Sequence, residues 1–246
     1  MSNGFFSEIK SVLDSAFSSL LLFSRPKVTA VIPAFNEEKT IGLVIIAAKA
    51  TGKIDEILVV DDGSSDKTFE IAKKLGARVL RHDVNKGKGQ AIVTGIKNSL
   101  GEVIVFLDAD WSNISPEKIN QILAPVLSSE ADFVKASFSR IGGRITEFAA
   151  KPMMKILYPN HEFSQPLSGQ FAARKSFLEN LKIEPKYGID IGILIDAINH
   201  GLRIKEVDVG LLEHKHRPDL EVAESSKQVL ETILKKSVYV KKKKKF

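Results

Sequence analysis

Mainly apolar runs alternate with amphipathic stretches along the first half of the chain. The apolar runs occupy residues 28–32, 57–60, 77–80 and 103–107, and such runs are typical of strands buried on both faces of a parallel sheet. Residues with helical spacing follow each run. Strands that alternate with helices imply right-handed crossovers. The pattern therefore predicts an α/β fold with a mostly parallel sheet and flanking helices.

Polar side chains follow three of these runs at the point where each strand should end. Asn36 and Glu37 follow the first run, Asp61 and Asp62 the second, and the segment 108–110 the fourth. Carboxyl ends of parallel strands meet at one edge of the sheet, so these groups should converge there. Buried carboxylates need a cation or access to water. A divalent metal that neutralises a diphosphate would satisfy them; capping of the next helix is the alternative for 108–110.

The composition excludes several classes of function. The chain has 246 residues, 43% of them hydrophobic and 27% charged, with a net charge of +6. Residues 241–245 are five lysines, so the rest of the chain is nearly neutral, which argues against a nucleic-acid-binding face. The chain has no cysteine, which excludes disulfides and fits a reducing compartment. We therefore expect a cytoplasmic protein with no nucleic-acid partner.

The two ends of the chain differ from its body. Residues 1–26 carry apolar side chains at helical spacing, which predicts an amphipathic helix that packs on the domain or on a second subunit. Its polar positions are mainly serine and aspartate, which weakens attachment to a membrane surface. No apolar stretch approaches the ~20 residues of a membrane-spanning helix. Residues 237–246 are expected to form a disordered, lysine-rich tail, and a patch that binds a membrane surface is the alternative.

Four ordered motifs in the first half resemble those of GT-A fold glycosyltransferases of the family 2 type. The motifs are VIPAFNEE at 31–38, VVDDGSSD at 59–66, NKGKG at 85–89 and FLDAD at 106–110. The resemblance implies a Rossmann-like fold that binds nucleotide-diphospho-sugars. It also implies one GT-A domain over 27–236, with a nucleotide-binding half at 27–110 and an acceptor-binding half at 111–236.

Four motifs in the second half narrow the resemblance to glucosyl-3-phosphoglycerate synthases. They are GGRITE at 142–147, QPLSG at 165–169, YGIDIG at 187–192 and HKHRP at 214–218. This similarity implies a homodimeric, metal-dependent retaining enzyme that transfers glucose from UDP-glucose to 3-phosphoglycerate. The sequence leaves glucose or mannose, UDP or GDP, and Mg²⁺ or Mn²⁺ open.

On the donor side, the resemblance assigns a set of residues to the nucleotide sugar. They are Pro33, Ala34, Asn36, Glu37, Asp62, Lys88, Asp108, Ala109 and Asp110. Asp110 and His214 match the metal ligands, and Asp108 would contact the ribose or a metal-bound water. Oxygen ligands with one imidazole suit Mg²⁺ or Mn²⁺ better than zinc.

On the acceptor side, a glycine-rich helix start followed by an arginine suits a phosphate, although it also fits an ordinary turn with an exposed arginine. The resemblance assigns to the acceptor Gly143, Arg144, Ile145, Thr146, Tyr187 and Arg217. Asp190 would align the attacking hydroxyl, and Leu167, expected in an apolar strand, would contribute shape or a backbone carbonyl.

The chain departs from these synthases on the acceptor side. Asp190 and Gln170 each stand where a glutamate is usual, and the loop before Gly142 is shorter. Two alternatives therefore stay open: a polyprenyl-phosphate glycosyltransferase and a non-catalytic sugar-nucleotide-binding module.

Overall fold

A computed structural model describes residues 25–139, 143–183, 188–212 and 219–243. Within these residues one seven-stranded sheet has the order β3-β2-β1-β4-β6-β5-β7, and β6 alone runs antiparallel to its neighbours. The strands are β1 (Val28–Ala34), β2 (Glu56–Asp61), β3 (Arg78–Arg81), β4 (Val103–Phe106), β5 (Phe133–Ser139), β6 (Phe171–Arg174) and β7 (Ile204–Leu211). The helices are α2 (Ile41–Ala50), α3 (Thr68–Lys74), α4 (Lys88–Asn98), α5 (Pro116–Leu127), the π-helix η1 (Thr146–Ala150), α6 (Lys151–Leu157), α7 (Lys175–Leu178), α8 (Ile189–Asn199) and α9 (Asp219–Lys243).

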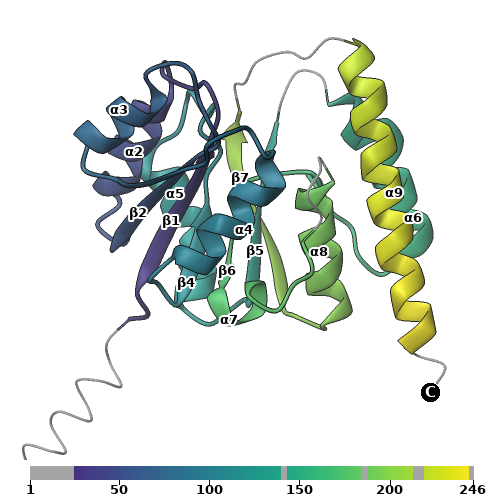
Figure 1. The fold of residues 1–246 in the computed structure, drawn as a ribbon. Helices are drawn as coiled ribbons and strands as arrows, with labels where there is room; N and C mark the ends of the chain where they lie inside the picture. The colour runs from purple at the N-terminus through teal and green to yellow at the C-terminus, as the bar shows by residue number, and fades with distance from the viewer. Residues whose placement is uncertain (1–24, 140–142, 184–187, 213–218, 244–246) are drawn as a thin grey trace, which may run out of the picture.

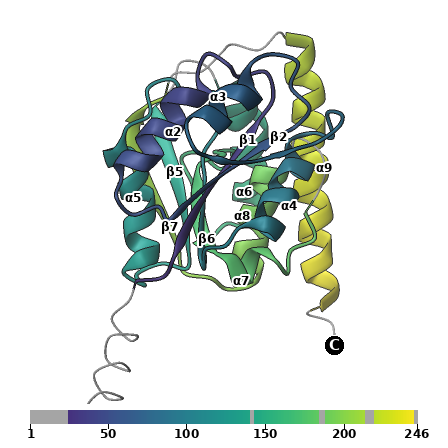
Figure 2. The ribbon, with the colours of Figure 1, turned by 60° about the vertical axis from the view of Figure 1, so that its left-hand side comes forward.

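Helices cover both faces of the sheet, which makes three layers (Figures 1 and 2). One core contains side chains of α2, α3 and α5, and the other contains side chains of α4, α6, α8 and α9. The strands β1, β2 and β4 are buried on both sides, and every residue of β4 is buried, whereas the edge strands β3 and β7 are more exposed. The expected α/β architecture with a mostly parallel sheet is therefore confirmed.

Strand β1 pairs in parallel with β2 and with β4, and β2 pairs in parallel with β3. Consequently β1, β2 and β4 end at the same edge of the sheet, and the polar segments that follow them come together there. The four strands expected in the first half are all present, with ends within two residues of the predicted ones.

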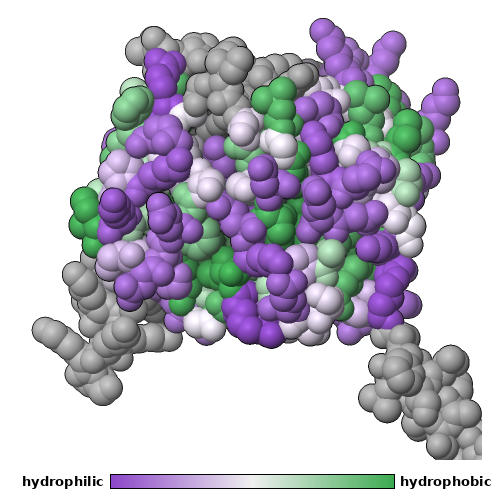
Figure 3. All heavy atoms as spheres, turned by 180° about the vertical axis from the view of Figure 1, so that it is seen from behind, coloured by the Kyte–Doolittle hydropathy of each residue, from purple (hydrophilic) through white to green (hydrophobic). Residues whose placement is uncertain are grey.

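The surface is largely polar. Seen from behind, hydrophilic side chains cover most of the described molecule and apolar side chains are interspersed among them (Figure 3). In the part of the chain that the structure describes, no helix is long and apolar enough to cross a membrane. The cytoplasmic location stays a prediction.

Two expectations about local structure were wrong. Leu167 lies in a turn closed by a hydrogen bond from the Ser168 N–H to the Gln165 carbonyl, and β6 begins only at Phe171. The lysine-rich end, expected to be disordered, is helical as far as Lys243, and residues 244–246 lie outside the described residues. Residues 1–24, with most of the predicted amphipathic helix, lie outside the described residues.

Candidate active site

A pocket of about 290 Å³ opens at the carboxyl ends of β1, β2 and β4. Every predicted donor-side residue except Asn36 lines it. The lining residues are Pro33, Ala34, Phe35, Glu37, Asp62, Asn85, Gly87, Lys88, Ala91, Asp108, Ala109 and Asp110. The strand-end residues predicted from separate motifs therefore share one cavity.

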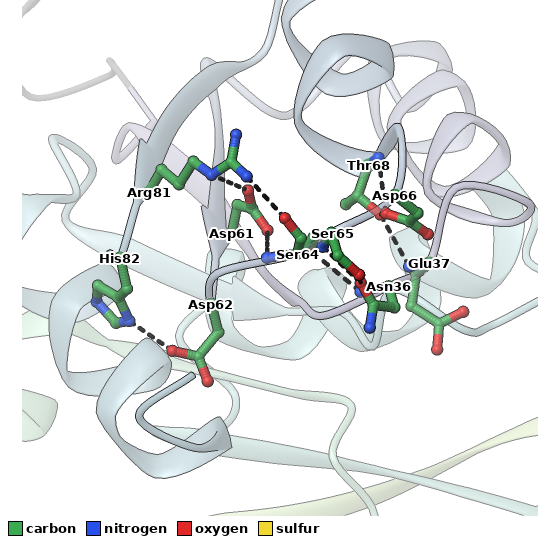
Figure 4. Close-up of polar contacts among 10 residues, drawn as sticks. All are labelled: Asn36, Glu37, Asp61, Asp62, Ser64, Ser65, Asp66, Thr68, Arg81 and His82. Atoms are coloured by element: carbon green, nitrogen blue, oxygen red, sulfur yellow. Dashed lines mark hydrogen bonds and ion pairs between the residues drawn. The ribbon is translucent and has the colours of Figure 1, made fainter. Parts of the chain in front are cut away.

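Asn36 has a different position from the one expected. It adopts a left-handed backbone conformation with φ of 55°, which asparagine tolerates better than most residues. Its N–H donates to Ser64 Oγ at 2.9 Å and its Oδ1 accepts from the Ser65 N–H at 2.9 Å (Figure 4). Asn36 thus joins the loop after β1 to the loop after β2.

The same two loops are joined a second time beside Asn36. The Glu37 N–H donates to Thr68 Oγ1 at 2.8 Å, and Thr68 in turn donates to Asp66 (Figure 4). The Glu37 carboxylate accepts from the Thr40 hydroxyl at 3.0 Å near the start of α2. Glu37 therefore serves the helix start as well as lining the pocket.

Asp62 holds the glycine loop that precedes α4. Its Oδ2 accepts from the Gly87 N–H at 2.7 Å, and its Oδ1 accepts from the Lys86 N–H at 3.0 Å. His82 Nδ1 lies 2.6 Å from the same Oδ1 (Figure 4). Gly87 has φ of 89°, a conformation that side-chain-bearing residues rarely adopt. Asp62 is thus largely engaged within the protein, in addition to facing the pocket.

Lys88, the first residue of α4, joins the two sides of the site. Its Nζ lies 2.8 Å from Asp108 Oδ1 and 3.1 Å from Asp190 Oδ2. Burial lowers the pKa of Lys88, but the charges of Asp108 and Asp190 raise it more, so the net pKa lies above its usual value. The lysine is therefore a cation between a carboxylate of the donor side and one of the acceptor side.

The second oxygen of Asp108 is also engaged. Gln170 Nε2 donates to Asp108 Oδ2 at 2.8 Å, and Gln170 Oε1 accepts from Ser168 Oγ at 3.0 Å. Gly169 leaves room for the contact between Lys88 and Asp108, because a Cβ at this position would lie 2.6 Å from Lys88 Nζ and 2.5 Å from Asp108 Oδ2. Both Asp108 oxygens therefore have partners within the protein.

The helix-capping alternative for these aspartates does not hold. The N-cap of α5 is Ser115, whose side chain accepts from the Lys118 N–H. Asp108 and Asp110 lie on the pocket instead.

Asp190 lies in the first turn of α8 and is buried. Burial raises its pKa, and so does the negative charge of Asp108, while Lys88 and Lys135 act in the opposite direction. Among the described residues its Oδ1 has no hydrogen-bond partner. A buried carboxylate oxygen without a partner is costly, so this atom is suited to accept a hydrogen bond from a ligand.

The remaining acceptor-side residues are only partly described. Gly143 has φ of 93°, Arg144 is exposed, and Ile145 and Thr146 are buried at the start of η1. The phosphate-binding role of this segment stays a prediction. Tyr187, Arg217 and the predicted metal ligand His214 lie outside the described residues.

The carboxylates present fit a hard divalent cation. No group of three or more acidic or histidine side chains could hold a metal within the described ranges. Mg²⁺ commonly uses one or two protein carboxylates and takes its other ligands from water and substrate phosphates. Asp110, with Asp108 beside it, supplies a donor set of that kind.

Sequence reasoning missed two polar residues under the site, Gln170 as a partner of Asp108 and the fully buried Lys135 of β5. The signal for Lys135 was available, since a lysine in the middle of an otherwise apolar strand needs a partner inside the protein.

The fold and the pocket define a GT-A glycosyltransferase: a mostly parallel sheet whose strand ends gather aspartates and a lysine around one cavity. Residues 29–188 match the family model described as glycosyl transferase family 2. The chain belongs to this family.

Within this family, the chain is similar to glucosyl-3-phosphoglycerate synthases. The chain is 36% identical over 234 residues to the glucosyl-3-phosphoglycerate synthase of Mycobacterium tuberculosis, which covers 84% of this chain and 72% of the relative. It is 34% identical over 237 residues to the enzyme of the same name from Petrotoga mobilis, over 85% of this chain and 73% of the relative. A crystal structure of the M. tuberculosis enzyme with Mn²⁺, UDP-glucose and phosphoglyceric acid matches with a TM-score of 0.80 and 34% identity, over 86% of this chain and 80% of that one.

Proposed function

We propose that this protein is a metal-dependent retaining glucosyltransferase that transfers glucose from UDP-glucose to 3-phosphoglycerate and forms glucosyl-3-phosphoglycerate. The observation that carries the proposal is the position of Lys88 between Asp108 and Asp190. This contact places the predicted acceptor carboxylate beside the donor pocket, and a transfer between two bound substrates requires the two sites to be adjacent.

The donor side would be formed by the residues that line the pocket. Pro33, Ala34 and Glu37 lie at the end of β1, where backbone groups can meet a nucleobase. Lys88 would bind the diphosphate, because it is a cation at the N-terminus of a helix, where the helix dipole also favours anions. Asp62 would keep the loop of Lys88 in place through its bonds to Lys86 and Gly87.

Asp110, with the predicted ligand His214, would hold Mg²⁺ or Mn²⁺; crystal structures of the M. tuberculosis relative contain one or the other. A metal bound there would act as a Lewis acid that stabilises the departing diphosphate.

On the acceptor side, Asp190 would accept a hydrogen bond from the attacking hydroxyl through its Oδ1, which has no partner among the described residues. Its raised pKa favours a group able to take up a proton. Leu167 would limit the shape of the site beside it, and Arg144 would bind the phosphate of the acceptor. No second carboxylate is assigned as a nucleophile, so we expect attack on the same face as the departing diphosphate.

A matrix of donors and acceptors tests the proposal. UDP-glucose, GDP-glucose and GDP-mannose are crossed with 3-phosphoglycerate and a polyprenyl phosphate, with Mg²⁺, Mn²⁺ or EDTA. We expect turnover for UDP-glucose with 3-phosphoglycerate, no turnover in EDTA, and an α-linked product in the NMR spectrum. Turnover on the polyprenyl phosphate alone would favour the membrane-acceptor alternative, and binding without turnover would indicate a non-catalytic module.

Three further assignments belong to the same proposal. We propose a cytoplasmic location, because a nucleotide sugar and a phosphorylated acceptor are both intracellular metabolites. We propose a homodimer as well, which the resemblance to glucosyl-3-phosphoglycerate synthases implies. We also retain 27–110 as the nucleotide-binding half and 111–236 as the acceptor-binding half of one catalytic domain. Equilibrium sedimentation of the purified chain tests the dimer.

A further inference from the structure

Lys135 is a buried charged residue in β5, the strand beside the edge strand β7. It lies in the middle of β5, opposite Phe171 of β6 and Glu206 of β7, and has no exposed surface. Removing an ammonium group from water is costly unless hydrogen bonds inside the protein replace its hydration. Hydrogen-bond partners inside the protein must therefore stabilise the buried ammonium group.

The partners are two backbone carbonyls from different parts of the chain. Lys135 Nζ donates to the Ser168 carbonyl at 2.8 Å and to the Asp190 carbonyl at 3.2 Å. The ammonium also lies 5.7 Å from the centre of the Phe171 ring, a distance at which a cation is attracted to a ring face. One side chain thus ties the turn before β6 to the first turn of α8.

Those two segments carry the residues predicted to act at the transfer step. Leu167 immediately precedes Ser168, and Asp190 supplies the second carbonyl itself. Above them, Ser168 bonds Gln170, Gln170 bonds Asp108, and Lys88 joins Asp108 to Asp190. These contacts form a closed ring, which Lys135 completes through its hydrogen bonds to the Ser168 and Asp190 carbonyls.

We propose that Lys135 is a positioning residue that fixes Asp190 relative to the Leu167 turn, and so sets the acceptor side of the site against the donor side; the inference rests on the proposed glucosyl transfer. Lys135 lines no part of the pocket, so it acts through the backbone of the residues that do. Its role differs from that of Lys88, which contacts the carboxylates directly.

The charges around Lys135 are consistent with this position. Burial lowers the pKa of Lys135 and Lys88 lowers it further, whereas Asp190, Glu206 and Asp108 raise it; the net pKa lies below its usual value. The three nearby carboxylates therefore offset part of the free-energy cost of burying the ammonium group.

The test compares two lysine-to-methionine variants. K135M removes both hydrogen bonds and keeps the volume of the side chain. K175M is the matched control, because Lys175 also donates to a backbone carbonyl, that of Ser99 at 2.7 Å, but does not line the pocket. Transfer from UDP-glucose to 3-phosphoglycerate is measured by kcat and by KM for each substrate, and UDP affinity by calorimetry with Mn²⁺.

We expect kcat of K135M to fall about a hundredfold, since a misplacement of about 1 Å costs ~10²-fold in rate. UDP affinity should stay within about threefold of the wild type, because β1, β2, α4 and β4 build the donor pocket. K175M should keep both values within about threefold. K135Q, which retains an N–H₂ donor at shorter reach, should recover part of kcat and decides the matter if K135M does not fold.

Two results would overturn the inference. In one, K135M keeps the kcat of K175M; in the other, kcat and UDP affinity of the Lys135 variants fall in proportion, as they would if the whole site had loosened. A wild-type protein that turns over no donor–acceptor pair would instead refute the proposed function, which separates the two failures.

Discussion

Replacing Gly169 by alanine would put a methyl group into the contact between Lys88 and Asp108. An added Cβ would lie 2.5 Å from Asp108 Oδ2, 2.7 Å from Asp108 Oδ1 and 2.6 Å from Lys88 Nζ. Ordinary van der Waals contact begins near 3.4 Å, so these atoms would have to move by about 0.7 to 0.9 Å. The long side chain of Lys88 can make that movement, whereas the 2.8 Å ion pair cannot survive it unchanged.

The expected result is a large loss of rate with a small loss of stability. A displacement approaching 1 Å at the reacting groups costs roughly ten- to a hundredfold in kcat, or about 1.4 to 2.7 kcal/mol. The free energy of unfolding should change by about 1 kcal/mol or less, because flexible side chains absorb the added volume. Steady-state kinetics and urea denaturation measure the two quantities separately.

Gly101 supplies the contrasting control. A Cβ there would lie 2.6 Å from the Thr29 backbone N and 2.8 Å from the Lys27 carbonyl, which are rigid atoms at the opposite end of β1. G101A should therefore lose stability and keep the kcat of its folded fraction. Wild-type kcat in G169A, or equal kcat losses in the two variants, would refute the role given to the Lys88–Asp108 contact.

Three further predictions concern the metal, the acceptor and a buried charge. D110N should abolish metal-dependent turnover with little change in the unfolding midpoint, because a half-exposed strand-end carboxylate adds little packing; unchanged Mn²⁺ activation would contradict it. R144A should raise KM for 3-phosphoglycerate about ten- to a hundredfold, as expected for loss of a charge-assisted hydrogen bond, and spare KM for UDP-glucose; the reverse would place Arg144 on the donor side. Burial lowers the pKa of Lys135 to about 8, so between about pH 8 and 10.5 the unfolded chain binds this proton and the folded chain does not. The unfolding free energy of the wild type should therefore rise relative to K135M across that range, by roughly 3 kcal/mol, and a flat difference would exclude the shifted pKa.

The residues that follow a strand could be predicted, because a local pattern determines them. An apolar run followed by aspartates locates Asp62, Asp108 and Asp110 at the edge of the sheet whatever the rest of the chain does. All three lie on the pocket. Their partners could not be predicted in the same way. Asp62 was assigned to the nucleotide, yet it also accepts from the backbone of the glycine loop.

The two errors of local structure have physical reasons. Around Leu167, apolar residues are interrupted by Pro166 and Gly169, which favour a turn over a strand. In the lysine-rich end, the run of like charges predicts disorder. However, lysine is a good helix former, and Val229 and Ile233 of the same helix are buried in the core beside α8, so the helix continues into the basic segment.

The surroundings of Asp190, the predicted acceptor carboxylate, could not be predicted from local sequence patterns. Asp190 is one methylene shorter than the glutamate usual at this position, which suggested a loss of reach. In the structure the Nζ of Lys88, 102 residues earlier in the chain, donates to the Asp190 carboxylate. Lys135, 55 residues earlier, donates to the Asp190 backbone carbonyl. The position of the carboxylate is therefore determined by two lysines from other elements as well as by its own side chain. A contact between such distant residues leaves no periodic signal in the sequence.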